Sequence, residues 1–244
     1  CWGISAHPNG DGTVRNGAFQ GTKLSELWEK HPELFGNTGM DRFPLLIKII
    51  DAKDDLSIQV HPDDAYAKVH ENGSLGKTEC WFILDCKENA ALVVGHNAKT
   101  KEELEQMIHE GKWKEFIREI PIKPGDFIQI DPGTVHAIKG GTLLLETQQS
   151  SDITYRVYDY DRLSNGKPRQ LHIAQSIEVI TVPAKSAENS VIHTEEKEDA
   201  IQQLIQCPYY TVYRIDVEHR METWQDKPFV LMSVVEGEGT LNGT

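Results

Sequence analysis

Residues 56–64 (LSIQVHPDD) contain three polar side chains at a spacing that would bring them together. Ser57, Gln59 and His61 alternate with apolar residues, which is the two-residue period of a β-strand, so their side chains point to the same face. Pro62 cannot donate a ladder hydrogen bond and ends the strand directly after the imidazole. An amide and an imidazole on one strand face can bind a metal, but a polar strand face exposed to water has the same pattern. The strand alone leaves both interpretations open.

Two later segments add the groups that a metal site needs. A strand with a charged beginning at 76–84 carries Glu79, and a Pro-Gly turn at 132–133 leads to His136. Two imidazoles and one carboxylate, with a coordination position left open, suit a catalytic zinc ion. The alternative is a set of unrelated surface or core residues. Because all three occur together, we expect His61, Glu79 and His136 to bind a metal, with the oxygen of Gln59 as a fourth ligand.

The elements that position these residues are predicted to be mostly strands. Many short runs of alternating polarity are separated by Gly and Pro, which is typical of a closed β-barrel or jelly roll. Near residues 99–120 the period becomes helical, beginning with a capping box of Thr100 and Glu103, and we interpret this part as a helical insertion. Residues 1–183 are therefore expected to form one β domain that contains the insertion.

The remaining residues, 184–244, are predicted to begin a second β domain. Strands are expected at 209–217 and 229–235, followed by a turn at 237–239. A strand and turn that have only just begun do not make a complete domain, so we expect the sequence to cover this second domain only in part.

Composition narrows the possible partners. Of the 244 residues, 39% are hydrophobic and 26% are charged, which fits a globular chain able to bury a core. The formal net charge of −13 argues against nucleic acid or an anionic membrane as a partner. The four cysteines show no Cys-x-x-Cys pairing, and no secretory signal opens the sequence, so we expect a cytoplasmic protein with free thiols.

The spacing around the expected ligands resembles the two sequence motifs of the cupin barrels. Gly125, Pro132-Gly133 and His136 match the second motif. Gln59-x-His61 followed by Glu79 resembles the first motif, which is normally His-x-His followed by Glu. Here a glutamine replaces the first histidine, and the interval before the glutamate is longer. The resemblance implies a cupin, or jelly-roll, barrel for the first domain and part of a second cupin barrel after it.

Five further runs, in the same order along the chain, resemble the type I mannose-6-phosphate isomerases, and the short bacterial branch of that family fits best. The runs are FPLLIK at 43–48, LSIQVHPD at 56–63, GKTE at 76–79, PGTVHA at 132–137 and ETQQSSDITYRVYDYDR at 146–162. The resemblance implies a zinc enzyme, with one ion per chain, that interconverts mannose 6-phosphate and fructose 6-phosphate. By the family pattern His61, Glu79 and His136 are the zinc ligands, Gln59 is a fourth, and Arg156 is the active-site arginine.

The reaction itself indicates which other side chains are needed. An aldose–ketose isomerisation moves a proton between C2 and C1 through an enediol, so it requires a base and a group that stabilises the developing oxyanion. Lys48 lies inside an apolar run, where a lysine either reaches the surface or is held for a function. It and Lys77 resemble family lysines that line the cleft. For the proton carrier we expect Glu146, with Asp152 and a zinc-bound water as alternatives; Glu146 is equally well interpreted as a carboxylate that orients a lysine or arginine.

The phosphate of the substrate is expected to lie against Ser57 and one lysine, either Lys48 or Lys77. Longer relatives of the eukaryotic type carry a basic residue in a Thr-Pro-Lys segment after the arginine, and here Arg162 stands in the corresponding region. Two other classes of protein fit the motifs: a cupin oxygenase that uses another metal, and a sugar-binding cupin without catalysis. The lysines and Arg156 favour the isomerase. We expect a small sugar phosphate as the only ligand besides the metal, with no nucleic acid or membrane partner, and a monomer or weak homodimer.

Overall fold

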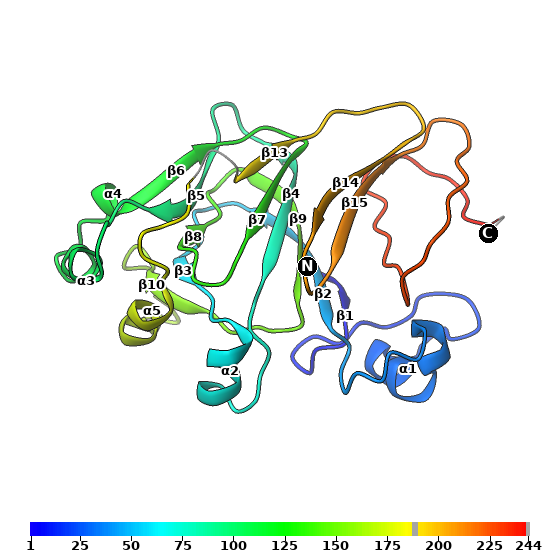
Figure 1. Ribbon diagram of the computed structural model, residues 1–244, viewed down its shortest axis with the longest axis horizontal. Coiled ribbons are helices and arrows are strands. Elements are labelled where there is room, and N and C mark those ends of the chain that lie inside the picture. Colours follow the sequence, from blue (N-terminus) through cyan, green and yellow to red (C-terminus); the bar gives the residue numbers. More distant parts are fainter. Residues whose placement is uncertain (187–189, 243–244) are drawn as a thin grey trace.

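The computed structural model describes residues 1–186 and 190–242, and its main feature is a pair of antiparallel sheets that face each other as a barrel (Figure 1). The first sheet has six strands in the order β1-β2-β9-β4-β7-β13. Their bounds are Trp2–Ser5, Leu45–Ala52, Thr142–Gln149, Glu79–Cys86, Asp126–Ile130 and Val191–His193. The second sheet has five strands in the order β10-β3-β8-β5-β6. Their bounds are Tyr155–Tyr158, Ile58–Val60, His136–Ala137, Ala91–His96 and Ile117–Pro121.

Alternation along the strands divides the inside of the barrel into an apolar end and a polar end. On β9, Leu144, Glu146 and Gln148 point to the same side, because successive side chains of a strand alternate between faces. The residues opposite them on β4 are Ile83, Trp81 and Glu79. Leu144, Ile83 and Trp81 join an apolar core. Glu146, Gln148 and Glu79 are also buried, so this end of the barrel holds polar groups away from water.

Helices cover the outer face of the second sheet. They are α3 (Lys101–His109), α4 (Trp113–Phe116) and α5 (Ile173–Val179), and they pack on the side of the sheet opposite to Gln59. Leu104, Ile108 and Phe116 supply buried side chains of this layer. The helical insertion is therefore present, but it is shorter than the predicted 99–120. From Ile117 the chain is a strand, because Ile117 to Pro121 pair with β5.

The remaining short elements border the barrel. A helix α1 (Leu24–Lys30) and a 3-10 helix at Pro32–Phe35 form an aromatic cluster with Phe43. The helix α2 (Asp64–His70) follows β3, and a small hairpin of β11 (Leu163–Ser164) and β12 (Lys167–Pro168) follows β10. Among the described residues, no helix is both long and apolar enough to cross a membrane.

The C-terminal part contributes a hairpin of β14 (Ala200–Gln206) and β15 (Thr211–Asp216). Its Leu204 and Tyr210 pack on the outer face of the first sheet, against Cys80 and Phe127. Among the residues that the structure describes, the segment expected to be a strand at 229–235 has no partner strand, and its backbone is irregular. Of the expected second domain, residues 187–189 and 243–244 lie outside the described part.

The first sheet continues past the predicted domain boundary at 183. Residues Val191–His193 form β13 and pair with β7, so they belong to the sheet of the first domain. This strand has only three residues in a polar stretch, which is too short for its alternation to be recognised.

Candidate metal centre and active site

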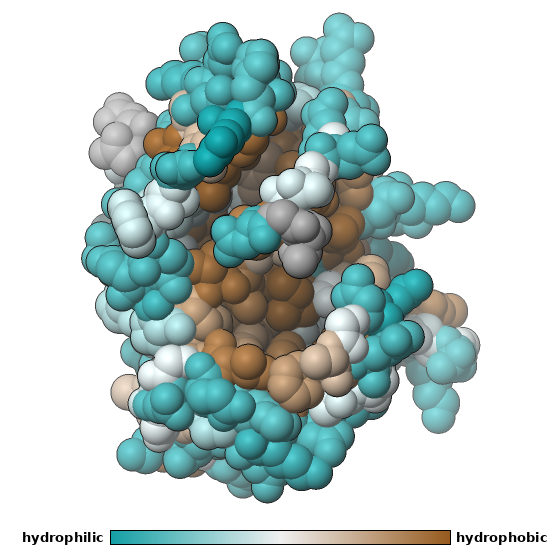
Figure 2. Space-filling model, turned by 90° about the vertical axis from the view of Figure 1, so that its right-hand side faces the viewer, coloured by the Kyte–Doolittle hydropathy of each residue, from teal (hydrophilic) through white to brown (hydrophobic). Residues whose placement is uncertain are grey.

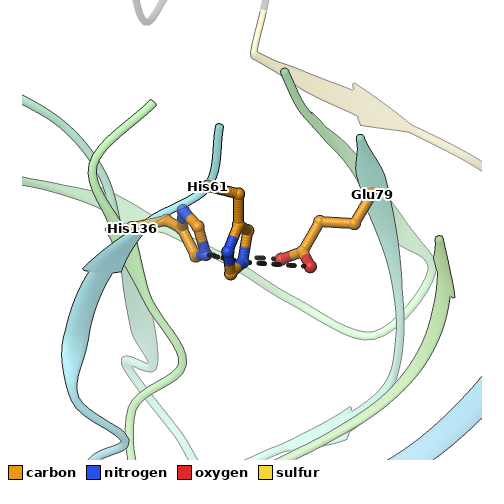
Figure 3. Close-up of side chains that lie close together, drawn as sticks. All are labelled: His61, Glu79 and His136. Atoms are coloured by element: carbon orange, nitrogen blue, oxygen red, sulfur yellow. Dashed lines mark hydrogen bonds and ion pairs between the residues drawn. The ribbon is translucent and has the colours of Figure 1, made fainter. Parts of the chain in front are cut away.

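Three residues at the ends of three strands meet at the polar end of the barrel (Figure 3). His61 directly follows β3, Glu79 begins β4, and His136 begins β8. The Nε2 atoms of the two histidines are 3.1 Å apart, and each lies 3.4 Å from an oxygen of Glu79. All three side chains are buried, with 1% or less of each exposed. The structure thus brings together the three residues that the sequence suggests as metal ligands.

Apart from an ion pair with Lys77, the carboxylate of Glu79 is free to bind a ligand. His136 Nδ1 is 2.8 Å from the carbonyl oxygen of Thr134, and this contact favours a proton on Nδ1 and a lone pair on Nε2. Across the described residues, both oxygens of Glu79 have no hydrogen-bond partner, although one of them forms an ion pair with Lys77 Nζ at 2.9 Å. Buried polar atoms without partners are costly unless a ligand satisfies them. The ligand atoms lie within 4.8 Å of one another, so this donor set fits a divalent cation.

The electrostatics favour the protonation states that bind metal. Burial, together with the nearby Lys77 ammonium, lowers the pKa of His61 to about 3, and burial also lowers the pKa of His136. Burial alone would raise the pKa of the Glu79 carboxyl, but the charge of Lys77 and the contact with His61 outweigh it and hold that pKa well below its usual range. Neutral imidazoles and an ionised carboxylate are the forms that coordinate a cation.

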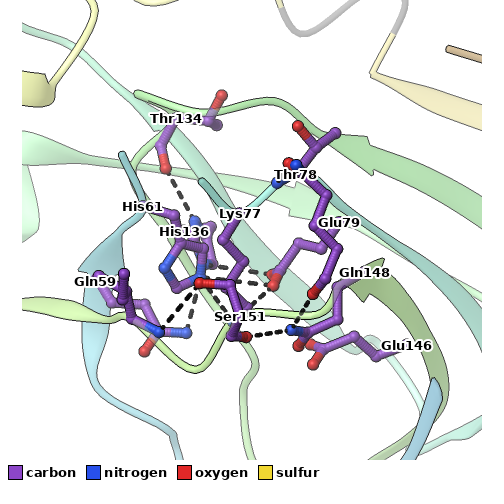
Figure 4. Close-up of polar contacts among 12 residues, drawn as sticks. Gln59, His61, Lys77, Thr78, Glu79, Thr134, His136, Glu146, Gln148 and Ser151 are labelled. Carbon is purple, nitrogen blue, oxygen red and sulfur yellow. Dashed lines mark hydrogen bonds and ion pairs between the residues drawn. The ribbon is translucent and has the colours of Figure 1, made fainter. Parts of the chain in front are cut away.

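Lys77 lies against the candidate ligands rather than apart from them (Figure 4). Its Nζ is 3.0 Å from His61 Nε2 and 2.9 Å from an oxygen of Glu79. Burial opposes protonation of Lys77, but Glu79 and Glu146 outweigh it and raise its pKa, so the side chain is an ammonium. A fixed positive charge therefore borders the cluster, where it can face an anionic ligand.

Gln59 and Ser57 border the same cluster from β3 and the residue before it. Gln59 is paired with His136 in the sheet, and its Nε2 is 3.3 Å from His136 Nε2. The hydroxyl of Ser57 donates a 3.4 Å hydrogen bond to Gln59 Oε1. The amide nitrogen of Gln59, not its oxygen, faces the imidazole in this conformation.

Lys48 and Glu146 form an ion pair beside the cluster, in which Glu146 is buried and Lys48 has 13% of its side chain exposed. Lys48 Nζ lies 2.9 Å from Glu146 Oε1 and also donates to Gln148 Oε1. The other oxygen of Glu146 accepts a 3.1 Å hydrogen bond from Trp81 Nε1. Both oxygens of Glu146 are thus engaged. Burial lowers the pKa of Lys48, and Glu146 only partly offsets this effect.

The two predicted arginines lie in different surroundings. Arg156 is opposite Gln59 in the sheet, and its buried Nε has no hydrogen-bond partner within the described ranges. Arg162, by contrast, is 2.6 Å from a carboxylate oxygen of Asp159 and also donates to a backbone carbonyl. Asp159 is shared with Arg169, so the charge of Arg162 is partly compensated. Asp152, the alternative proton carrier, accepts a hydrogen bond from Asn9 and has 42% of its side chain exposed.

Sequence reasoning missed Trp81 and Gln148, which hold the ion pair in place. Gln148 is fully buried and donates to the carbonyl oxygens of Gln149 and Ser151, at 2.9 and 2.5 Å, while accepting from Lys48. The one available signal was the alternation of Glu146 with Gln148, which places both side chains on the face that carries Lys48 across β2.

Comparisons with known proteins identify the family of this chain. The catalytic domain of type I phosphomannose isomerase matches residues 1–82, and the cupin domain of mannose-6-phosphate isomerase matches residues 200–244. The mannose-6-phosphate isomerase ManA of Bacillus subtilis is 54% identical over 243 residues, which are 99% of this chain and 77% of that protein. The chain belongs to the type I mannose-6-phosphate isomerase family. This membership confirms the family that the sequence motifs suggest.

Solved structures of the same family confirm the cupin fold. The crystal structure of the mannose 6-phosphate isomerase of Bacillus subtilis superimposes with a TM-score of 0.85 at 53% identity, over 89% of this chain and 70% of that one. A zinc-bound mannose 6-phosphate isomerase has a TM-score of 0.59 at 16% identity, over 78% of this chain and 68% of that one. The second likeness shows the fold alone.

Proposed function

We propose that this chain interconverts mannose 6-phosphate and fructose 6-phosphate, with one zinc ion bound by His61, Glu79 and His136. The observation that carries the proposal is the buried group of two imidazoles and one carboxylate, with unsatisfied atoms, in a chain of this family. Gln59 borders the group and is the proposed fourth ligand through its oxygen. Zinc would supply a Lewis acid that polarises the oxygens at C1 and C2 of the sugar.

Positive side chains around the group are proposed to bind the substrate. Arg156 offers a partly buried guanidinium whose Nε lacks a hydrogen-bond partner within the structure as described, so it can donate to a sugar or phosphate oxygen. Ser57 and Lys77 border the ligand residues and are the proposed contacts of the sugar phosphate. Arg162 is a fourth proposed contact, and its charge is partly compensated by Asp159.

For the proton transfer we propose that Lys48 carries the proton and Glu146 orients it. The neutral amine of Lys48 takes the proton from C2 of the aldose, an enediol forms, and the resulting ammonium returns the proton to C1. The other proton passes from the C2 hydroxyl to the oxygen at C1, so that the atoms balance. The engagement of both Glu146 oxygens, by Lys48 and Trp81, supports the orienting role over the role of base. The pKa of Lys48 is lowered by burial, which makes the neutral amine more accessible.

A coupled assay on mannose 6-phosphate, before and after chelation, tests the function. We expect activity that disappears with chelator and returns when zinc is added. Activity that is indifferent to the chelator would reduce the three ligand residues to a structural role. Oxygen consumption without isomerisation would favour an oxygenase, and a zinc-loaded chain without turnover would favour a binding protein.

A further inference from the structure

Asp64 is not a member of the candidate site, yet its carboxylate joins three separate parts of the chain. It is the first residue of α2, three positions after His61. Its Oδ1 accepts hydrogen bonds from the backbone N–H of Gly76, at 2.7 Å, and from Nε2 of Gln149, at 3.0 Å. Its Oδ2 accepts a 2.8 Å hydrogen bond from the hydroxyl of Tyr209. These bonds connect the start of α2 with the segment before β4, the end of β9 and the C-terminal hairpin.

The first partner, Gly76, leads directly into the segment that carries Lys77 and Glu79. A side chain at Gly76 would not fit, because an added Cβ would lie 2.4 Å from the backbone carbon of Asp63 and 2.5 Å from the backbone nitrogen of Asp64. The backbone of Gly76 therefore rests on the beginning of α2. The next residue, Lys77, donates its N–H to the carbonyl oxygen of Pro62, at 3.0 Å. The segment from Gly76 to Glu79 is thus fastened to the residues that follow His61.

The second partner, Gln149, reaches the same segment by another route. Its side-chain oxygen accepts a 2.9 Å hydrogen bond from the N–H of Thr78, and its own N–H donates to the carbonyl oxygen of Thr78 at 3.0 Å. Asp64 holds the amide of Gln149 in the orientation that makes the first of these bonds. The carboxylate consequently positions Gly76 directly and Thr78 through Gln149.

The third partner, Tyr209, belongs to the turn between β14 and β15. Burial and the bond to Asp64 raise the pKa of Tyr209 to about 12, so its hydroxyl remains a donor at neutral pH. The C-terminal hairpin thereby touches the same carboxylate that fixes the start of β4.

We propose that Asp64 is a positioning residue that holds Glu79 and Lys77 against His61, and that Tyr209 links the C-terminal hairpin to this arrangement. The inference rests on the proposed metal site, because its consequence is a preformed spacing between His61 and Glu79. The hydrogen bonds of the Asp64 carboxylate go to Gly76, Gln149 and Tyr209 and not to the ligand side chains. It acts through Gly76 and Gln149.

Zinc affinity, measured by competition with a chromophoric chelator, tests the proposal without an activity assay. We expect Asp64→Ala to weaken zinc binding by about tenfold, as for other residues that orient metal ligands. Asp63→Ala is the matched control, because Asp63 is adjacent and of the same type but only caps α2, accepting from the N–H of Tyr66 at 2.8 Å. Asp63→Ala is expected to leave the affinity unchanged.

Two further variants separate geometry from charge and from folding. Asp64→Asn retains an oxygen for Gly76 and removes the charge, so its affinity is expected to stay within about threefold of the wild type. Tyr209→Phe removes one hydrogen bond to the carboxylate but leaves those from Gly76 and Gln149, and it is expected to weaken binding by about two- to threefold. Urea denaturation of each variant is the control for folding, because it tests whether the folded fraction is the same in all the zinc titrations.

The outcomes distinguish the two proposals. A wild-type chain that does not bind zinc would overturn the metal site itself, and the role of Asp64 with it. If Asp64→Ala bound zinc as tightly as the wild type, only the role of Asp64 would be overturned. Equal losses of zinc affinity in Asp64→Ala and Asp63→Ala would assign the effect to the stability of α2. Equal losses in Asp64→Ala and Asp64→Asn would assign it to the charge of Asp64. An unchanged zinc affinity in Tyr209→Phe would remove the link to the hairpin.

Discussion

At the scale of single residues, burial and the charge of Glu146 have opposite effects on the protonation of Lys48, the proposed proton carrier. Burial favours the neutral amine, whereas the carboxylate of Glu146 favours the ammonium. Because the net effect lowers the pKa of Lys48, a larger fraction of the amine is neutral at a given pH than in an exposed lysine. The activity is therefore expected to rise with pH until Lys48 has lost its proton.

Substitution of the two residues separates their roles. Lys48→Met is expected to lower kcat by about 10²–10⁴, which is the range for loss of a general base. Glu146→Gln removes a negative charge, so the pKa of Lys48 falls further and the rising limb of the pH–rate profile moves to lower pH, with a smaller loss of kcat. The profiles of both variants, and the rate of solvent-proton exchange at C2, are the measurements.

Glu146 would be the base if Glu146→Gln abolished exchange at C2 while Lys48→Met retained it. Glutamine has nearly the same shape as glutamate and can still accept from Trp81, so it is the gentlest available change. The same measurements show whether Asp152 remains a candidate base, since it lies outside the Lys48–Glu146 ion pair.

Sequence reasoning brings His61, Glu79, His136, Lys48 and Glu146 together because each belongs to a short motif. It does not find Asp64, Trp81 or Gln148. Asp64 looks like one more polar residue at the start of a helix, and its three partners are 12 to 145 positions away in sequence. In the sequence, Trp81 resembles any apolar core residue. Its indole nitrogen reaches Glu146 only because β4 pairs with β9 in this register. Contacts of this kind depend on strand register, which short motifs do not specify.

At the scale of elements, the turn before β8 connects the strands of His61 and His136. Gly133 donates its N–H to the carbonyl oxygen of His61 at 2.9 Å and accepts from the N–H of Thr181 at 3.0 Å. It adopts a φ of +80°, and a Cβ there would lie 2.4 Å from Thr181 Oγ1 and 2.8 Å from the carbonyl oxygen of Val179. The glycine of the cupin motif is thus required both by the backbone conformation and by the close approach of the segment after α5.

Gly133→Ala is expected to lower the free energy of unfolding by about 2–4 kcal/mol, from backbone strain together with the clash. Gly166→Ala is the control, because Gly166 also has a positive φ, +76°, but no atom lies near the position of its Cβ. It is expected to cost about 1 kcal/mol, which is the strain alone. Urea denaturation gives both values, and equal losses would show that the approach of Thr181 is unimportant.

Strands were harder to predict where they need a distant partner. The alternation at 229–235 is strand-like, yet this segment pairs with nothing in the part of the chain that the structure describes. Alternation records only that a segment can present two faces, whereas a strand forms when another edge is available. The short β13 is the opposite case. Its own sequence does not predict a strand, but β7 provides an edge with which it pairs.

At the scale of the whole molecule, the C-terminal hairpin has two apolar faces, and only one of them is covered. Leu204 is 5% exposed where it packs on the first sheet, whereas Ile201, Tyr213 and Ile215, on the other face, are 41–45% exposed. Figure 2 shows the side of the molecule that carries this hairpin, where apolar residues line a hollow with a hydrophilic rim. Exposed apolar surface of this kind promotes association.

Matched substitutions on the two faces are expected to behave differently. Ile215→Thr keeps a β-branched residue at an exposed site, so the free energy of unfolding is expected to change by no more than about 0.5 kcal/mol while self-association decreases. Leu204→Thr places a hydroxyl in the covered face and is expected to cost about 2–4 kcal/mol. Urea denaturation and sedimentation velocity are the measurements. A loss of stability in Ile215→Thr as large as that in Leu204→Thr would mean that both faces are covered in solution.

The position of Trp81 has an optical consequence. Of the five tryptophans, it is the one with no exposed surface, and its ring stands edge-on to His136 with centroids 5.5 Å apart. Trp81, which is buried away from water, is expected to emit at a shorter wavelength than the fully exposed Trp224. The emission wavelengths of the two side chains therefore separate their signals. Because the imidazole next to Trp81 is a proposed ligand, filling the site changes the electronic surroundings of a fluorophore already in place. The intrinsic fluorescence of the blue-emitting fraction therefore offers a label-free titration signal for the metal.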